Sequence, residues 1–205
     1  HLGHPPMISE LRFAKSYSSV WRGLAPTMEL FVRKANLRLY SRDSSEMTAT
    51  SLPSARSMIN QVAFQTVVNV RKLLPAGEVL SAVQDPEYLR AAELGLSGVE
   101  LLDEAGVAEA GELAVRMVQR LFGSGLGTVV LSPRFEGCGI LNACFGDALS
   151  SSGEIIELKD GDRPFRSYDF RQVSIYAALQ FNSTSQAPPF LTIVNSRRGI
   201  SMRTS

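Results

Sequence analysis

Apolar residues recur at helical spacing through the first half of the chain. Over residues 9–40 and again over residues 51–74, apolar side chains lie three or four positions apart, which predicts helical structure in both stretches. Ser51 is expected to cap the second helix, with Pro53 in its first turn. The Ser- and Thr-rich stretch 42–51 is expected to form a loop or linker.

Weaker helical segments continue to about Val107, and the pattern then changes. Residues 108–122 are amphipathic at helical spacing and lead into a glycine-rich stretch, residues 123–127. A phosphate-binding loop needs a strand before its glycines and a helix after them, and here that order is reversed. We therefore interpret these glycines as a helix stop and a tight turn.

Beyond the glycines the chain consists mainly of short runs that are typical of strands, with one helical segment among them. The runs cover residues 128–132, 140–149, 154–159 and 190–194. The helical segment, residues 167–181, lies between the last two runs. The order from residue 108 onward is helix, three strands, helix, strand. This order predicts an α/β core in which a three-stranded meander and a helical crossover make a mixed sheet with helices packed on it.

These patterns divide the chain into a helical N-terminal region, residues 1–107, and an α/β core, residues 108–205. The long apolar helix face of the first region has two explanations. It either mediates assembly, as a homodimer or by docking to a larger partner, or packs against the α/β half in a core of this one chain.

Composition places the chain among ordinary globular proteins, with 44% hydrophobic and 20% charged residues over 205 positions. A net charge of +1 provides no overall attraction to nucleic acid, so a basic surface has to come from local clustering. Such clustering occurs near the C-terminus, where six arginines accompany one acid, Asp169. The six are Arg163, Arg166, Arg171, Arg197, Arg198 and Arg203.

Cys138 and Cys144 have no histidine or further cysteine nearby, which argues against a zinc site. The sequence shows no secretory signal and no apolar run of the roughly 20 residues that span a bilayer, so we expect a cytoplasmic protein without membrane contact. The chain begins with His1 rather than methionine, which indicates a tag remnant or a piece of a longer protein.

The segment from residue 145 to residue 159 carries the most informative pattern, that of a β-hairpin. Residues 151–153 fit a three-residue loop, in which glycine is favoured at the last position. The strand register then follows by counting outward from the loop. Leu149 faces Ile155, and two positions further Asp147 faces Glu157.

Two carboxylates that face each other across neighbouring strands repel one another unless a positive charge lies between them. Because side chains alternate along a strand, Lys159 projects on the same face as Glu157, while Ile156 and Leu158 point into a core on the other face. Hard carboxylate oxygens are the ligands that Mg²⁺ prefers, and the backbone carbonyl of Leu158 is a further candidate ligand. This arrangement suits phosphodiester hydrolysis, because the metal activates a bound water and Lys159 stabilises the charge on the phosphate.

An acid, a short hairpin and then acid-any-lysine on the next strand resembles the PD-(D/E)XK nuclease superfamily. Asp147, Glu157 and Lys159 stand at its three positions. Gln172 and Tyr176 match the Gln, three residues, Tyr pattern of the RecB-type branch, and four-residue spacing places both on one helix face. The resemblance covers residues 108–203. Gly146 stands where the family name has proline.

The resemblance implies a restriction endonuclease-like αβββαβ fold and a Mg²⁺-dependent endonuclease that hydrolyses DNA, with Mn²⁺ able to substitute. It implies that Gln172 and Tyr176 support the site or hold the nucleic-acid backbone. A further acid often joins the metal in this family, and Glu136 is the first candidate, with Glu112 on the preceding helix the second. Glu112 is also spaced for an ordinary helix ion pair with Arg116. The biological setting it suggests is a bacterial restriction or anti-phage system, in which the chain is the effector.

Arg163, Arg166 and Arg171 open the second core helix near the expected metal site. They are expected to contact phosphates of DNA or RNA, which would position the nucleic acid without reading its sequence; a solvated basic face is the other explanation. The alternative function is a catalytically idle nuclease-fold subunit that acts as a nucleic-acid-binding or assembly module.

Overall fold

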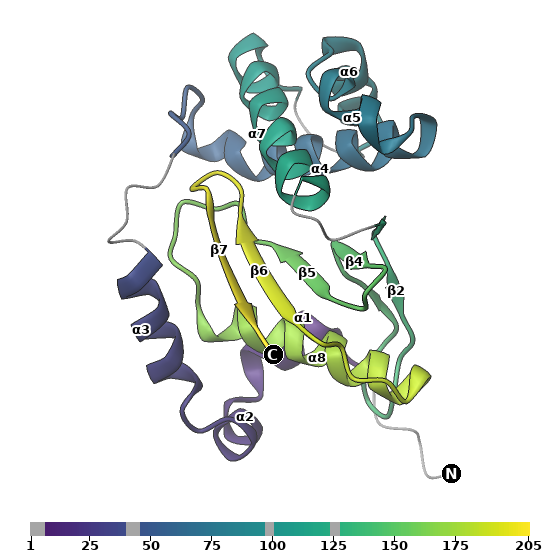
Figure 1. Ribbon diagram of the computed structural model, residues 1–205. Coiled ribbons are helices and arrows are strands. Elements are labelled where there is room, and N and C mark those ends of the chain that lie inside the picture. The colour runs from purple at the N-terminus through teal and green to yellow at the C-terminus, as the bar shows by residue number, and fades with distance from the viewer. Residues whose placement is uncertain (1–6, 40–45, 97–100, 124–127) are drawn as a thin grey trace.

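A mixed β-sheet lies between two groups of helices in the computed structural model, which describes residues 7–39, 46–96, 101–123 and 128–205 (Figure 1). The first group comprises α1 (Glu10–Ser16), α2 (Ser18–Leu24), α3 (Met28–Leu39) and α8 (Ser167–Thr184). The second comprises η1 (Pro53–Ala55), α4 (Arg56–Leu73), α5 (Ala76–Ala82), α6 (Pro86–Leu94) and α7 (Glu104–Phe122). The chain is therefore an α/β protein with a helical N-terminal half, as its sequence predicts.

The helical stretch predicted over residues 9–40 is interrupted twice. α1 ends at Ser16 and α2 at Leu24, and α3 starts anew at Met28. Proline lacks an N–H, and its ring disfavours the helical conformation in the residue before it. Pro26 therefore separates α2 from α3. Residue 40 lies outside the described residues, as do residues 42–45 of the predicted loop 42–51; residues 46–51 form neither helix nor strand, as predicted.

The second predicted helix begins later than expected. Pro53 opens the short η1 turn, and α4 follows from Arg56 without a side-chain cap. The expectation that Ser51 caps this helix is wrong, because its hydroxyl instead donates a 2.7 Å hydrogen bond to Oε2 of Glu109. Ser51 also lies one residue before Leu52, which holds the N-cap position of η1.

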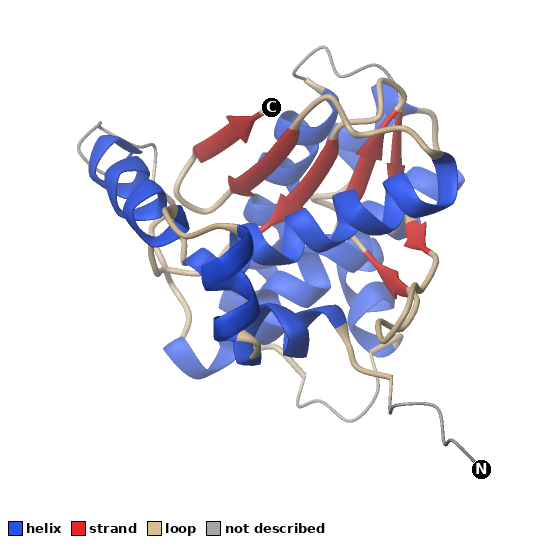
Figure 2. Cartoon of the chain, turned by 90° about the horizontal axis from the view of Figure 1, so that it is seen from below, coloured by secondary structure: helices blue, strands red, loops and turns tan. Residues whose placement is uncertain are grey.

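The sheet contains five strands in the order β1-β4-β5-β6-β7. Their bounds are β1 (Val129–Leu131), β4 (Ala148–Ser150), β5 (Ile155–Leu158), β6 (Leu191–Asn195) and β7 (Ile200–Thr204). β5 and β6 are parallel, and the other neighbouring pairs are antiparallel. Parallel neighbours need a crossover connection, and α8 supplies it; Figure 2 shows this helix crossing in front of the strands.

Two strands were not expected, and one expected run is divided. The run 140–149 splits into β3 (Cys144–Phe145) and β4, because the N–H of Gly146 donates to the carbonyl of Pro133 at 3.0 Å and turns the chain. β3 pairs with β2 (Arg134–Phe135) in a separate two-stranded sheet. β7 was missed because its alternation of apolar and polar residues is short and includes Arg203.

The two faces of the sheet pack against different helices. Ile155 and Ile193 belong to the core under α8, together with Trp21 of α2. On the opposite face Ile156 packs with Leu121 of α7. A third cluster lies among α4, α5, α6 and α7. Because α7 spans residue 107, this helical core crosses the boundary expected between the N-terminal region and the α/β core.

A buried polar network ties the helices α4 and α7 to the end of the sheet. Arg197, 1% exposed, lies in the β6–β7 turn and bonds to the carboxylate of Glu109 on α7 and to Oδ1 of Asn60 on α4, the latter at 3.2 Å. Burial opposes ionisation of Glu109, but hydrogen bonds from Ser51, Arg197 and Thr50 outweigh it and hold its pKa at about 2. Glu109 therefore stays charged and anchors both halves.

The glycine stretch begins where α7 ends. α7 ends at Phe122 with Gly123 as its C-cap, which confirms the helix stop; residues 124–127 lie outside the described residues, as does His1. Within the described ranges, no helix combines the length and the apolar character that crossing a membrane requires.

Arg197→Met should destabilise the protein by about 3–5 kcal/mol, because removing one partner leaves the buried Glu109 carboxylate without its counter-ion. Urea unfolding at pH 7 measures the change. Arg116→Met, which breaks the exposed Glu112–Arg116 pair, is the control and should cost less than about 1 kcal/mol. Equal losses in the two variants would contradict the network's anchoring role.

Candidate active site

The hairpin that carries the acidic residues has the register predicted from the sequence. Ala148 pairs with Ile156 and Leu149 with Ile155. Gly153 closes the loop with a φ of +85°, a conformation that favours glycine. The hydroxyl of Ser150 accepts a 3.0 Å hydrogen bond from the N–H of Glu154 and braces the loop. Continuing this register by one position brings Asp147 opposite Glu157.

Both acids and the lysine lie on the α8 face of the sheet. Leu149 and Ile155 are each two positions from one of the acids, so they point to the same face as Asp147 and Glu157. Both belong to the core under α8. Ile156 belongs to the core under α7, and Leu158 packs against it. The prediction that one strand face is apolar and the other carries Glu157 and Lys159 is confirmed.

A chain of hydrogen bonds links the site from β4 to α8. The N–H of Leu158 donates to Oδ2 of Asp147 at 2.7 Å. Nζ of Lys159 donates to Oε1 of Glu157 at 2.5 Å and to Oε1 of Gln172 at 2.9 Å. Nε2 of Gln172 donates to the hydroxyl of Tyr176 at 2.7 Å, and this hydroxyl donates to the carbonyl of Phe145 at 3.4 Å. Hydrogen bonds therefore join Glu157, Lys159, Gln172 and Tyr176 directly, and Asp147 is tied to the same strand through the Leu158 backbone.

Ionising both carboxyl groups of the site is unfavourable. Burial, followed by the charge of Asp147, raises the pKa of Glu157 to about 8. Burial also raises the pKa of Asp147. For Lys159, burial opposes the charge, but the Glu157 carboxylate outweighs it and raises the lysine pKa. Lys159 thus stays protonated, whereas the negative charge of one acid opposes ionisation of the other.

The donor set fits a hard divalent cation. Glu157 is 3% exposed, and its Oε2 is buried with no hydrogen-bond partner among the described residues. In a strand, the N–H and C=O of one residue point toward the same neighbour, so the Leu158 carbonyl lies on the side of Asp147. Two carboxylates and one carbonyl suit Mg²⁺, which keeps several waters. In the described parts of the chain, no three acidic, histidine or cysteine side chains are placed so that they could hold a metal ion together.

Tyr176 is held by aromatic stacking as well as by Gln172. Its ring stacks on Phe135 with centroids 5.0 Å apart and planes 10° apart. A Cβ at Gly146 would lie 2.8 Å from the Phe135 ring, and a proline there would also lose the N–H that bonds to Pro133. Glycine at this position therefore permits the stack behind the site.

The structure does not bring the two candidate third acids to the site. Glu136 is exposed and pairs with Arg134 at 3.3 Å. Glu112 lies on α7, on the other side of the sheet, and pairs with Arg116 at 3.0 Å as its spacing predicts. The two carboxylates of Asp147 and Glu157 are the acidic pair that the fold assembles.

The three predicted phosphate-binding arginines have different environments. Arg163 forms two hydrogen bonds to Asp169, at 2.7 and 2.8 Å. Arg166 is exposed and lies near Tyr168. Arg171 is buried and bonds to the carbonyl of Ala14 and to Glu29, so it joins α8 to the N-terminal helices.

Two further acids lie near the site, and neither is among the predicted site residues. The charge of Glu10, on α1, helps to raise the pKa of Tyr176, after burial and the charge of Glu157. Asp160 follows Lys159 directly, and burial raises its pKa to about 6 although the N–H of Ser196 bonds to it. The position of Asp160 beside the motif was a usable signal, whereas Glu10 is brought near only by the tertiary fold.

Comparison of the chain with protein-family models, curated proteins and solved structures yields no match. The interpretation of the site therefore rests on its own geometry.

Glu157→Gln should remove a pH-dependent loss of stability in metal-free protein. Because the folded-state pKa of Glu157 is raised from 4.5 to about 8, the stability that its proton contributes is lost as the pH rises between these values. The glutamine Oε1 still accepts from Lys159. At pH 9 the variant should exceed wild type by about 1–3 kcal/mol, or about 2–4 °C in Tm per kcal/mol.

Thermal melts in chelator from pH 5 to 9 measure this difference. Glu112→Gln, at an exposed ion pair, should follow the wild-type curve. Parallel curves for Glu157→Gln and wild type would show that Glu157 is not strained.

Gly146→Ala should destabilise the protein by about 1–3 kcal/mol through overpacking against Phe135. Gly77→Ala is the control, since a Cβ there meets nothing within 4 Å, and it should be neutral or stabilising by about 0.4–1 kcal/mol. Adding Phe135→Leu to Gly146→Ala should recover part of the loss in chemical unfolding. No difference between the two glycine variants would refute the close approach.

Proposed function

We propose that the chain is a Mg²⁺-dependent endonuclease that hydrolyses phosphodiester bonds of DNA. The observation that carries the proposal is the pair Asp147 and Glu157 facing each other, with the ammonium of Lys159 beside them and a Glu157 carboxylate oxygen that has no partner in the described part of the chain. The element order α7, β1, β4, β5, α8, β6 supports a restriction endonuclease-like αβββαβ core, to which the β2–β3 pair and β7 are additions.

In this proposal Asp147, Glu157 and the Leu158 carbonyl hold Mg²⁺, with Mn²⁺ able to replace it. The ion, when bound, would lower the pKa of a water and offset the charge on the phosphate. Lys159 stays protonated beside Glu157, so its ammonium stabilises the negative charge that develops on the phosphate or orients the attacking water. The hydrogen bond from the Leu158 N–H limits the orientation of the Asp147 carboxylate, which supports its role as a ligand.

Gln172 and Tyr176 act as positioning residues. The Gln172 carbonyl oxygen accepts from Lys159, and its amide nitrogen donates to Tyr176. Stacking on Phe135 fixes the Tyr176 ring. A lysine side chain has several rotatable bonds, so this support limits the ammonium to the neighbourhood of Glu157.

A catalytically idle nuclease-fold subunit that binds nucleic acid or assembles with partners is the second proposal. The Lys159–Glu157 bond favours it, because this bond neutralises one buried carboxylate without a metal ion. Both proposals are compatible with an effector role in restriction or anti-phage defence. Both are also compatible with a homodimer or a larger complex formed through the N-terminal helices.

Asp147→Asn and Lys159→Met should each lower cleavage of supercoiled and linear DNA in Mg²⁺ or Mn²⁺ by at least about 100-fold. Mg²⁺ should raise the Tm of wild type and leave that of Asp147→Asn unchanged. Glu78→Gln, an exposed change on α5, is the control and should cut like wild type. Equal cutting by every variant would assign the activity to a contaminant, and absence of cutting in wild type would favour the idle subunit.

A further inference from the structure

Three cations surround the ring of Tyr168 at the start of α8. Nζ of Lys15 lies 5.2 Å from the ring centroid, Cζ of Arg163 lies 5.0 Å from it, and Cζ of Arg166 lies 5.8 Å from it. Lys15 comes from α1, whereas both arginines precede α8. We call these four residues the Tyr168 cluster. Each contact is within the range of a cation–π interaction, which holds cations near one another despite their repulsion.

The cluster carries unbalanced positive charge. Its acidic neighbour, Asp169, is occupied by two hydrogen bonds from Arg163. Lys15 and Arg166 are exposed, and among the described residues neither has a carboxylate within ion-pair distance. Two cations that are already gathered around one ring need little further ordering to bind an anion between them.

The cluster lies on the same stripe of α8 as the candidate active site. Tyr168, Gln172 and Tyr176 are four positions apart, so they follow one another on one helix face. Tyr168 therefore lies about 6 Å along the helix from Gln172. Gln172 bonds directly to Lys159, so an anion at the cluster would be a close neighbour of one at the active site.

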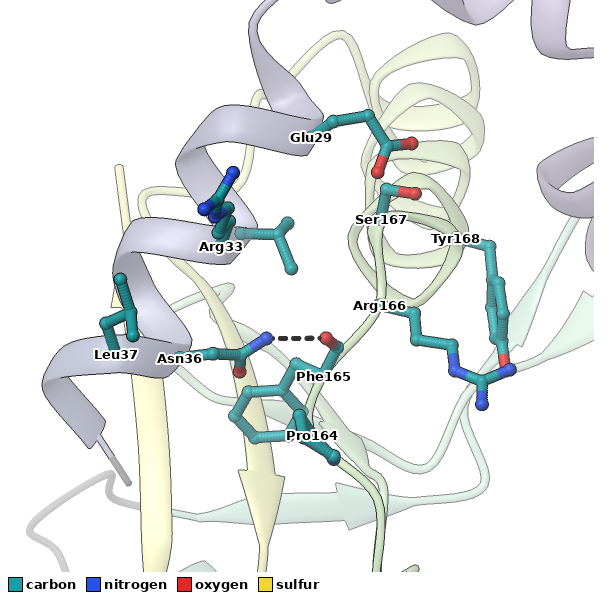
Figure 3. A pocket seen from close by; sticks show the side chains of 10 residues that line it. Glu29, Arg33, Asn36, Leu37, Pro164, Phe165, Arg166, Ser167 and Tyr168 are labelled. Atoms are coloured by element: carbon teal, nitrogen blue, oxygen red, sulfur yellow. Dashed lines mark hydrogen bonds between the residues drawn. The ribbon is translucent and has the colours of Figure 1, made fainter. Parts of the chain in front are cut away.

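A groove of about 730 Å³ runs between α3 and residues 164–168 and adjoins the cluster at Arg166 and Tyr168. Arg166 and Tyr168 line it, and Figure 3 shows the Arg166 guanidinium beside the Tyr168 phenol. From α3 the groove is lined by the apolar Val32 and Leu37 and by the polar Glu29, Arg33 and Asn36; the Glu29 carboxylate accepts a hydrogen bond from Arg171. The volume is in the range of small-molecule sites. In a duplex the bases are stacked between the two strands and cannot enter a groove on a protein. A mainly apolar groove beside a phosphate site therefore suits the base of an unpaired nucleotide.

We propose that the Tyr168 cluster binds the backbone phosphates of a single-stranded nucleic-acid segment next to the active site, and that the adjoining groove takes an unpaired base. This inference rests on the proposed nuclease function for its substrate. It adds that the strand beside the cleaved bond is unpaired, and it assigns contacts to Lys15 and Tyr168 that no sequence pattern indicated. It also replaces Arg171, which is internal, with Lys15 from α1.

The test measures binding in the full chain carrying Asp147→Asn, which should bind without cutting. Fluorescence anisotropy follows a labelled oligothymidylate and a duplex of equal length over a range of salt. Adding Lys15→Gln and Arg166→Gln together should weaken strand binding about 10-fold or more and lower the salt slope by about 1.4, since each phosphate contact on a single strand contributes about 0.7. Duplex binding should weaken less, because paired bases cannot enter the adjoining groove.

Lys72→Gln, an exposed lysine on α4, is the matched control and should leave strand binding unchanged. In the otherwise wild-type chain, the double variant should keep its Mg²⁺-dependent rise in Tm, which separates loss of the cluster from loss of the metal site. Unchanged strand affinity and salt slope in the double variant would overturn the proposal, as would equal losses on strand and duplex. Intact strand binding by a protein that never cuts DNA would overturn the nuclease function and leave this inference standing.

Discussion

The repulsion between the carboxylates of Asp147 and Glu157 is the constraint that the surrounding structure has to withstand. Burial strengthens it, because the electrostatic interaction between charges grows as water is removed. The fold opposes it with the hairpin register, with the bond from the Leu158 N–H to Asp147 and with the ammonium of Lys159. An arrangement that stores repulsion between two carboxylates is expected where a cation is to be bound.

The rest of the molecule holds this strained pair in place from both faces of the sheet. On one face α8 presents Gln172 to Lys159, and α8 is itself joined to the N-terminal helices by Arg171. On the other face the Glu109–Arg197 network ties α7 to the β6–β7 turn. The helical half and the sheet therefore share one set of buried contacts, so the N-terminal region contributes to the rigidity of the site.

Local patterns were sufficient for the centre of the site but not for its surroundings. A three-residue loop sets the register of the hairpin, so the facing of Asp147 and Glu157 could be counted from the sequence. The spacing of Gln172 and Tyr176 likewise predicts one helix face. The environment of Arg171 could not be predicted, because its partners are Ala14 and Glu29, far away in the chain. The environment of Ser51 could not be predicted either, because its hydroxyl bonds to Glu109, which is far away in the chain.

The N-terminal segment owes its place to parts of the chain that are made much later. Ile8 exchanges backbone hydrogen bonds with Ile140 and Asn142, and the Ala14 carbonyl accepts from Arg171, 157 positions further on. At about 5–20 residues per second, a ribosome needs about 8–30 s to reach that arginine. Through this interval Ala14 and Trp21 lack the partners that bury them, so the first two helices can take their final place only after α8 has been made.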